Sequence, residues 1–492
     1  MYTSTTSSSK TIYYLRKIIP IPESGLLKFF SMAFLMFCIL CNQSMLRILK
    51  DSIVISEVNA EITGFAKVVI FPVAAILVIL YSKVADRVPY TKIYSVVVTS
   101  FILFFLTFAF FIYPNVDCLH ISYDTVSRLS FNHPYLRWYL LLFGNWGYTT
   151  FYVLAELWPD VVYVIFFWQL ANHITTVEQA RSFYPALSFF GNSATAFMGM
   201  FMLYITSPNC LVYKVFNFCS SKILLVKVCV CILAIFGFVS IYLVHFISRT
   251  IIKESFLCVG VDTKKKATIG IIEGLKYVAK SRYLWIITTC STAFYFSMNL
   301  AEALWKAEVS VAYPTVSQYA HLSSMCIFWT GVFTMILNVA GKSIMRLLNW
   351  KMIFSIPPVT MAVSGCLFFG VSLFVNYSSF SSTFVYLPVI FGAVHSVLAK
   401  GVKYSVWDIS KEMLYIPLDP IMKTRGKAAT DLIGSKFGKS FSSIVPVIIL
   451  SFSKATGYLA IAPVIAVLFV IVCIIWLIAA HFLSLEYEKR VN

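Results

Sequence analysis

The sequence predicts an all-α membrane protein with twelve transmembrane helices in two groups of six and both termini in the cytoplasm. Its composition is the first reason. Of the 492 residues, 59% are hydrophobic and only 12% are charged, and the mean hydropathy is +0.83. A soluble domain carries about 25% charged residues. A soluble fold could not cover its core with half of that, so lipid must be the solvent for much of this chain.

The second reason is the number of long apolar runs, since a helix needs about 20 apolar residues to cross a bilayer. The fourth run, residues 139–172, is longer than one span and is expected to project beyond the bilayer. The eleventh is the weakest, because a dense polar stretch precedes it. The runs begin near Leu26, Ile62, Ile93, Tyr139, Phe183, Ile223, Tyr283, Val316, Met352, Thr383, Phe437 and Tyr458.

The third reason is the placement of the 39 Lys and Arg residues. An even number of spans puts both termini on one side, and basic residues accumulate in cytoplasmic loops. With a cytoplasmic N-terminus, most of the Lys and Arg residues fall in cytoplasmic segments, and the outward loops hold only a few, such as Arg128 and Lys214. The charge pattern therefore agrees with the count of twelve.

These boundaries divide the chain into five parts. Residues 1–25 form a disordered cytoplasmic tail, 26–247 an N-terminal six-helix bundle, and 248–282 a basic cytoplasmic linker. Residues 283–485 form a C-terminal six-helix bundle, and 486–492 a second cytoplasmic tail. Two groups of six helices joined by a basic linker are typical of the major-facilitator architecture.

Several ionisable residues lie where the pattern predicts membrane spans. Each costs about 2.5–3.5 kcal/mol on insertion scales, so each is a functional hypothesis. One interpretation is that Asp51 pairs with Arg47 and Glu302 with Lys306, only to hold helices together. Buried pairs are a weak source of stability, so a basic central cavity for an anion, gated by acids, explains the set better. The residues are Arg47, Lys50, Asp51, Lys67, Glu156, Glu302 and Lys306.

Residues 400–440 form the most concentrated polar stretch, with Lys400, Lys403, Lys427 and Lys439 among glycines and acids. Lysines supply point charges for phosphate, and glycines allow close backbone approach. An ordinary basic loop would not explain the mixture of Asp, Glu, Pro and Gly. Only three residues separate Gly434 from Gly438, whereas a phosphate-binding loop has four between its glycines.

No hydrolytic triad, metal cluster or redox motif is readable in the sequence, so we expect a transporter that is not an enzyme and uses no cofactor or metal. The formal net charge of +18 follows the predicted topology, which argues against nucleic-acid binding. Asn376-Tyr-Ser378 is a glycosylation acceptor sequence in a short outward loop.

Several blocks of the chain resemble the nucleotide transporters of plastids and intracellular bacteria, the ATP/ADP translocases. The order and spacing of these blocks match across nearly the whole chain. The blocks include Leu46-Arg-Ile-Leu-Lys50-Asp51-Ser, Glu156-Leu-Trp158, Asn299-Leu-Ala-Glu302-Ala-Leu-Trp305-Lys306 and residues 400–440. One departure follows Lys439-Ser440, where this chain has Phe441-Ser-Ser in place of further glycines.

The resemblance implies a nucleotide antiporter that imports host ATP in exchange for ADP, with or without phosphate, into an intracellular parasite. Its substrates are ATP and ADP, and no obligate protein partner is implied. The alternative is a proton-coupled or broad-specificity purine nucleotide transporter of the same fold. The cell membrane is the expected location. The first 22 positions contain basic residues and no acidic ones, as organelle-targeting sequences do, so the membrane of a mitochondrion-derived organelle is the alternative location.

The resemblance also assigns site residues. Substrate binding is expected at Lys50, Glu156 and Glu302, with a further lysine from the eleventh-span region, either Lys427 or Lys439. From the charge pattern rather than the resemblance, gating or secondary roles are expected for Arg47, Asp51, Lys67, Lys306, Lys400 and Lys403.

Overall fold

The computed structural model describes residues 25–84, 87–133, 136–175, 177–207, 210, 221–252, 278–378, 384–419, 427, 430, 434, 438–453 and 455–491. Within these ranges the regular elements are all helices, which confirms the predicted all-α class. The predicted disordered tail and most of the predicted basic linker lie outside the described residues.

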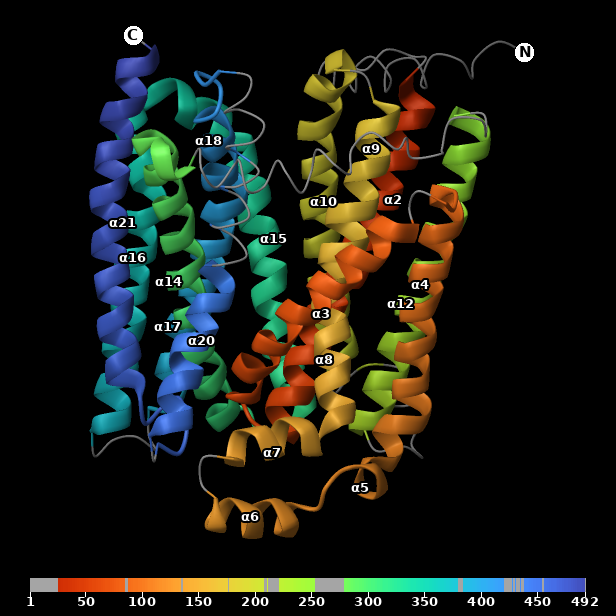
Figure 1. Cartoon of the computed structure of the whole chain (residues 1–492), viewed down its shortest axis with the longest axis vertical. Coiled ribbons are helices and arrows are strands. Elements are labelled where there is room, and N and C mark those ends of the chain that lie inside the picture. Colours follow the sequence, from red (N-terminus) through yellow and green to blue (C-terminus); the bar gives the residue numbers. More distant parts are fainter. Residues whose placement is uncertain are drawn as a thin grey trace.

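The first half of the chain forms one group of helices (Figure 1). Short elements between its third and fourth spans are η3 (Tyr113–Asn115), α5 (Val116–Leu119), α6 (Tyr123–Asn132) and α7 (Arg137–Gly144). The long elements are α2 (Leu26–Glu57), α3 (Ile62–Val84), α4 (Tyr90–Thr107) with η2 (Phe108–Ile112), α8 (Trp146–Trp158), η5 (Pro159–Phe167), α9 (Trp168–Ile174), α10 (Val177–Ile205) and α12 (Ser221–Ile247), which continues into η6 (Ser248–Ile252).

The second half forms the other group of helices, drawn from green to blue (Figure 1). Its elements are α14 (Arg282–Ala312), α15 (Val316–Leu347), α16 (Trp350–Tyr377), α17 (Tyr386–Val402), η9 (Lys403–Trp407), α18 (Asp408–Met413), α20 (Gly438–Phe452) and α21 (Ala462–Val491).

Each of the twelve predicted apolar runs coincides with helix. In the described part of the chain, eight helices are long and apolar enough to cross a membrane. Two shorter apolar helices, residues 62–74 and Gly438–Phe452, accompany them. A multi-pass helical membrane protein is therefore confirmed, whereas the count of twelve and the cytoplasmic position of the termini stay predictions.

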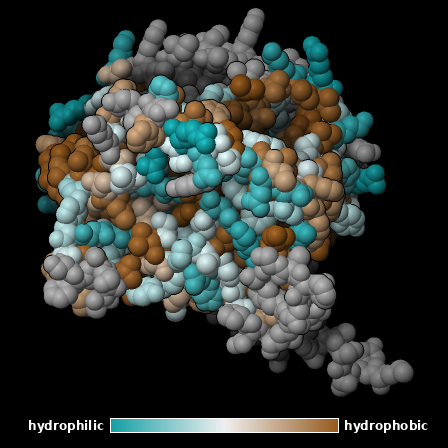
Figure 2. Space-filling view, turned by 90° about the horizontal axis from the view of Figure 1, so that it is seen from below, coloured by the Kyte–Doolittle hydropathy of each residue, from teal (hydrophilic) through white to brown (hydrophobic). Residues whose placement is uncertain are grey.

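The fourth run differs from its predicted form. It is divided at Asn145, which lies between α7 and α8. Helix α7 lies across the end of the molecule farthest from the start of α2 and the end of α21, with α6 beyond it (Figure 1). We call this the outer end. Seen from that end, hydrophilic residues gather over much of the middle, with hydrophobic residues toward the sides (Figure 2). Such a distribution suits a surface that faces water between lipid-facing flanks.

Several helix pairs join the halves, among them α10 with α15, α2 with α15 and α3 with α20. Glycines permit the first crossing. A Cβ on Gly331 of α15 would lie 2.6 Å from the backbone nitrogen of Ala196 in α10, and a Cβ on Gly199 of α10 would lie 2.5 Å from that of Phe328 in α15. Each helix thus places a glycine against the backbone of the other, as small residues do where membrane helices approach closely.

We expect Gly331→Ala to lower the free energy of unfolding by about 2 kcal/mol, because the added methyl group meets backbone that cannot rotate away. The measurement is thermal unfolding in detergent. Gly370→Ala in α16 is the matched control, since nothing lies within 4 Å of a Cβ there. Equal melting temperatures for the two variants would show that the α10–α15 crossing is not tight.

Candidate functional site

A network of charged side chains lies between the halves, away from lipid. Lys50 Nζ is 3.0 Å from Asp51 Oδ1 and 3.0 Å from Glu156 Oε2. Lys306 Nζ is 2.9 Å from the same Asp51 oxygen and 3.3 Å from Glu302 Oε1. Lys50, Asp51 and Lys306 are 5%, 6% and 2% exposed. Five residues that the sequence singled out are therefore brought into one cluster.

Asp51 joins the two halves within this cluster. It lies on α2 beside Lys50, and its second lysine, Lys306, comes from α14. Two ammonium groups compensate the buried charge of the Asp51 carboxylate. If one member of these ion pairs is removed, a charge stays buried without its partner, which is strongly destabilising. Asp51 therefore closes the interface between the halves at this level. The pair expected with Arg47 is replaced by these two contacts, whereas the Glu302–Lys306 pair is found as expected.

Lys67 adds a second polar contact between the halves. Its Nζ donates to Asn299 Oδ1 at 3.0 Å, from α3 to α14. Counting it, the cluster holds three lysines (Lys50, Lys67, Lys306) and three carboxylates (Asp51, Glu156, Glu302). The opposite charges are equal in number, so the cluster as it stands has no surplus charge for an anion.

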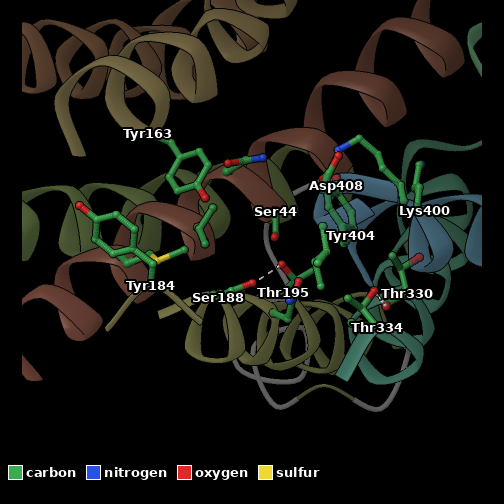
Figure 3. A pocket seen from close by; sticks show the side chains of 18 of the residues that line it. Ser44, Tyr163, Tyr184, Ser188, Thr195, Thr330, Thr334, Lys400, Tyr404 and Asp408 are labelled. Atoms are coloured by element: carbon green, nitrogen blue, oxygen red, sulfur yellow. Dashed lines mark hydrogen bonds and ion pairs between the residues drawn. The ribbon is translucent and has the colours of Figure 1, made fainter. Parts of the chain in front are cut away.

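A cavity of about 750 Å³ lies beside this cluster, between the halves. Its walls come from α2, η5 and α10 in the first half and from α15, α17, η9 and α18 in the second. Arg47 reaches it from α2, one turn before Lys50, and Lys400 and Lys403 reach it from the opposite half. Figure 3 shows Lys400 and Tyr404 on the side opposite Tyr163 and Tyr184.

The cavity is basic. Lys403 is compensated by Asp408, with Nζ 3.1 Å from Oδ2. Arg47 lies beside the hydroxyl of Tyr404. Within the described ranges, neither Arg47 nor Lys400 has a carboxylate within 4.0 Å. Two cations without an ion-pair partner on a cavity wall are suited to an anionic ligand, since charge-assisted hydrogen bonds to phosphate are strong.

Lys400 connects the cavity to the charged cluster. It lines the cavity, and it also lines a small void of about 10 Å³ together with Glu302 and His395. A ligand that attracts Lys400 therefore acts next to Glu302, the carboxylate that pairs with Lys306.

Two tyrosines occupy corresponding places in the two halves. Tyr163 lies in η5 and Tyr404 in η9, the π-helical segments of the fourth span of each half, and both line the cavity. π-Helical turns are rare and are frequent at functional sites. Sequence reasoning missed both residues, together with Tyr184, Thr330 and Thr334 of the cavity wall. The one signal for η5 is Pro159, which begins that segment.

The two lysines considered for the eleventh-span region lie outside the cavity wall. Lys427 forms an ion pair with Glu412, a residue of that wall. Lys439 Nζ lies 5.5 Å from the centre of the Tyr295 ring, and Lys403 Nζ lies 5.9 Å from the same centre. Both are therefore neighbours of the cavity, and the choice between them stays open.

Asn376, the predicted glycosylation acceptor, is in the last turn of α16. Its Nδ2 donates to Glu308 Oε1 at 2.6 Å, and Glu308 is 2% exposed. A sugar attached to this nitrogen would compete with that contact. Within the described residues, no group of three or more His, Cys, Asp or Glu side chains could hold a metal ion.

Comparison with known proteins identifies relatives along nearly the whole chain. A family model described as TLC ATP/ADP transporter matches residues 4–487. The chain is 43% identical to "ADP,ATP carrier protein 5" of Rickettsia felis over 495 residues, covering 99% of each protein. It is 43% identical to the protein of that name in Rickettsia prowazekii, covering 96% of each. It is 33% identical to "ADP,ATP carrier protein 4" of Rickettsia conorii, covering 99% of this chain and 98% of that one.

Solved transporters share the fold. The chain is similar to a bacterial homologue of the iron transporter ferroportin in an inward-facing state, with a TM-score of 0.55 and 12% identity over 95% of this chain and 99% of that one. It is also similar to the inward-open xylose transporter XylE from E. coli, with a TM-score of 0.53 and 11% identity over 94% and 96%. These likenesses support the expected major-facilitator-like arrangement of helices.

Proposed function

Because the chain belongs to the TLC ATP/ADP transporter family, we propose that it exchanges ATP for ADP through the cavity between its two halves. It is a multi-pass membrane transporter and not an enzyme. The observation that carries the proposal is a pair of cations, Arg47 and Lys400, which have no ion-pair partner among the described residues and lie on the wall of a cavity of about 750 Å³. Pockets for small molecules have volumes of about 300–1,000 Å³, so the cavity is large enough for a nucleotide.

In the proposed complex, the phosphate groups lie toward Arg47 and Lys400. Tyr163 and Tyr184 form the opposite side of the cavity (Figure 3), where an aromatic ring is available to stack on the base. Stacking of a base on an aromatic side chain contributes about 1–3 kcal/mol and tolerates different bases. The stacking ring therefore supports binding, and discrimination between adenine and guanine would come from polar groups of the wall.

Exchange without net flux follows from the charged cluster. In the empty state, its three lysines and three carboxylates compensate one another and hold the halves together at Asp51. Phosphate bound at Lys400 lies next to Glu302 and competes with it for lysine contacts. Glu302 and Lys306 both lie on α14, so the contact between the halves weakens when the phosphate also draws Lys306 away from Asp51. Reorientation then needs a nucleotide in each direction, as an exchanger requires.

We propose uptake of ATP from a host across the cell membrane; the relatives from Rickettsia, named ADP,ATP carrier proteins, support the two substrates. Exchange of ATP for ADP alone moves about one net charge, worth about 2.3 kcal/mol per 100 mV. Phosphate leaving with ADP would cancel much of that charge. A proton that enters with ATP would also cancel it. In the alternative, a proton-coupled transporter, transport would therefore depend on the pH gradient.

The test is uptake of labelled ATP by vesicles that contain the purified protein and are preloaded with ADP, ATP, GTP or buffer. We expect uptake with internal ADP or ATP and at least tenfold less with internal buffer. Internal phosphate added to ADP should raise the rate if phosphate leaves with ADP. Uptake that depends on a pH gradient and is indifferent to internal nucleotide would contradict the exchange mechanism.

A further inference from the structure

At the outer end, the two halves contact each other at a second place, where each half contributes a glycine. The proposed transport cycle assigns no role to this contact. Glu61 precedes α3 in the first half, and Tyr458 precedes α21 in the second. Tyr458 N donates to Glu61 Oε1 at 2.7 Å, and the Tyr458 hydroxyl donates to the Glu61 carbonyl oxygen at 3.4 Å. These residues are 397 positions apart in the sequence.

Each half provides a glycine that makes room for the side chain of the other. A Cβ on Gly64 would lie 2.2 Å from Tyr458 Oη, and a Cβ on Gly457 would lie 2.5 Å from Glu61 Oε1. The contact is therefore reciprocal. The tyrosine of the second half packs against a glycine of the first half, and the carboxylate of the first half packs against a glycine of the second. We call Glu61, Gly64, Gly457 and Tyr458 the outer latch.

The Glu61 carboxylate has an unusual environment. The residue is 4% exposed, and its second oxygen, Oε2, is buried without a hydrogen-bond partner among the described residues. Among the described residues, the charged side chain that influences this carboxylate is Arg137 of α7, which lies beyond ion-pair distance. The titratable group in contact with Glu61 is Tyr458. Helix α20 contributes the apolar Val447 beside Gly64. A buried carboxylate with only neutral donors is stabilised when it takes up a proton.

From this geometry we infer that the outer latch closes the outer mouth and that Glu61 is its proton-binding site, so that acid outside the membrane favours the closed mouth. The inference goes beyond ATP/ADP exchange and rests on alternating access by a transporter of this fold and on the predicted cytoplasmic position of the termini. When the mouth opens, Gly457 and Tyr458 leave Glu61, and its carboxylate enters water. When the mouth closes, the same carboxylate is buried again.

The direction of the pH effect follows from these two environments. Burial raises the pKa of Glu61 in the latched structure, and an exposed glutamate has a pKa of about 4.3. A group whose pKa is raised in one state stabilises that state when it is protonated. The closed mouth is therefore stabilised at pH values near and below 4.3, and this stabilisation is lost as the pH rises through the raised pKa. Opening should be easier at neutral pH.

The experiment measures opening directly and needs no nucleotide. Thr63, which is 3% exposed, is replaced by cysteine in a background with Cys118→Ser, and the rate of labelling by a membrane-impermeant maleimide is measured from outside on oriented vesicles. The same background without the Thr63→Cys change is subtracted. Labelling rates at each pH are corrected for the thiolate fraction with a free-thiol peptide.

Three variants give distinct expectations. Gly457→Ala, whose methyl group displaces the Glu61 carboxylate, should raise the labelling rate about tenfold, which corresponds to 1.4 kcal/mol. Glu61→Gln keeps an acceptor for Tyr458 N without the charge. It should therefore lower labelling severalfold at pH 7.5 and remove the difference in labelling rate between pH 7.5 and about pH 4.3, the pKa of an exposed glutamate. Glu57→Gln is the control, because Glu57 pairs with Lys222 and Tyr113 inside the first half, and it should leave labelling unchanged.

Two results would overturn the inference. If Gly457→Ala and Glu61→Gln both label at the parent rate, the latch does not hold the mouth closed. If Glu61→Gln keeps the parent's pH dependence, Glu61 is not the proton site. Because ATP is absent, a protein that failed to exchange nucleotides would still give either answer. A Gly457→Ala protein that did not fold would leave Glu61→Gln, a nearly isosteric change, to decide.

Discussion

Lys50→Ala is expected to abolish ATP/ADP exchange, and Glu156→Ala to do the same. Lys50 holds two carboxylates, Asp51 and Glu156, each 3.0 Å from its Nζ, and its ammonium group also lies 4.3 Å from the centre of the Tyr152 ring. Removing one partner from a buried ion pair costs about 3–5 kcal/mol, because the other charge stays buried without compensation. The measurement is labelled-ATP uptake in ADP-loaded vesicles, normalised to inserted protein.

A charge-balanced double variant separates transport from folding. In Lys50→Met with Glu156→Gln, one positive and one negative charge are removed together, and the network stays balanced. We expect the melting temperature in detergent to return toward that of the parent while exchange stays lost, because the lysine is needed when phosphate rearranges the contacts. If exchange returns with stability, the cluster only holds helices together, and its proposed part in the transport cycle is wrong.

Much of the fold could be predicted because hydropathy is a local property. Helices begin at Leu26, Ile62 and Val316, as the apolar runs do. The division at Asn145 was not predicted, since α7 and α8 are both apolar and hydropathy does not report a change of direction. A break in a helix depends on what packs against each part, and that information comes from distant residues.

The site shows the same division between local and distant information. The pair of Glu302 with Lys306 was expected, because residues four apart on a helix are neighbours, and it is present at 3.3 Å. For Asp51 the same spacing argument suggested Arg47, four positions earlier. The structure instead pairs Asp51 with Lys306, 255 residues away. The partner of Asp51 is thus set by tertiary packing and not by spacing along its own helix.

The aromatic residues of the cavity could not be chosen from the sequence. With 17% aromatic residues, Tyr163 and Tyr404 are two among many. What distinguishes them is that each lies in a π-helical segment of an equivalent span and lines the same cavity. That equivalence between the halves appears only in three dimensions, because the residues around the two tyrosines are not alike.

Lys400→Gln is expected to raise the KM for ATP by about 10–100-fold, since a hydrogen bond to a charged group contributes about 1.5–3 kcal/mol. Lys400 lines the cavity without a carboxylate partner among the described residues, so its charge is available to phosphate. Lys400→Arg should restore much of the affinity, because it keeps a cation at that place. The measurement is the concentration dependence of ATP uptake in vesicles preloaded with ADP.

The control is Lys351→Gln, which removes one positive charge from an exposed position at the start of α16. It tests whether the effect depends on the overall charge of the protein, which attracts anions to the membrane surface at low salt. We expect its KM to stay within about twofold of the parent value in 150 mM salt, where such attraction is screened within about 8 Å. Equal KM values for Lys400→Gln and Lys351→Gln would place the phosphate groups elsewhere. The cations of the cavity would then be structural, and the charged cluster around Lys50 would have to bind the nucleotide by giving up its own ion pairs.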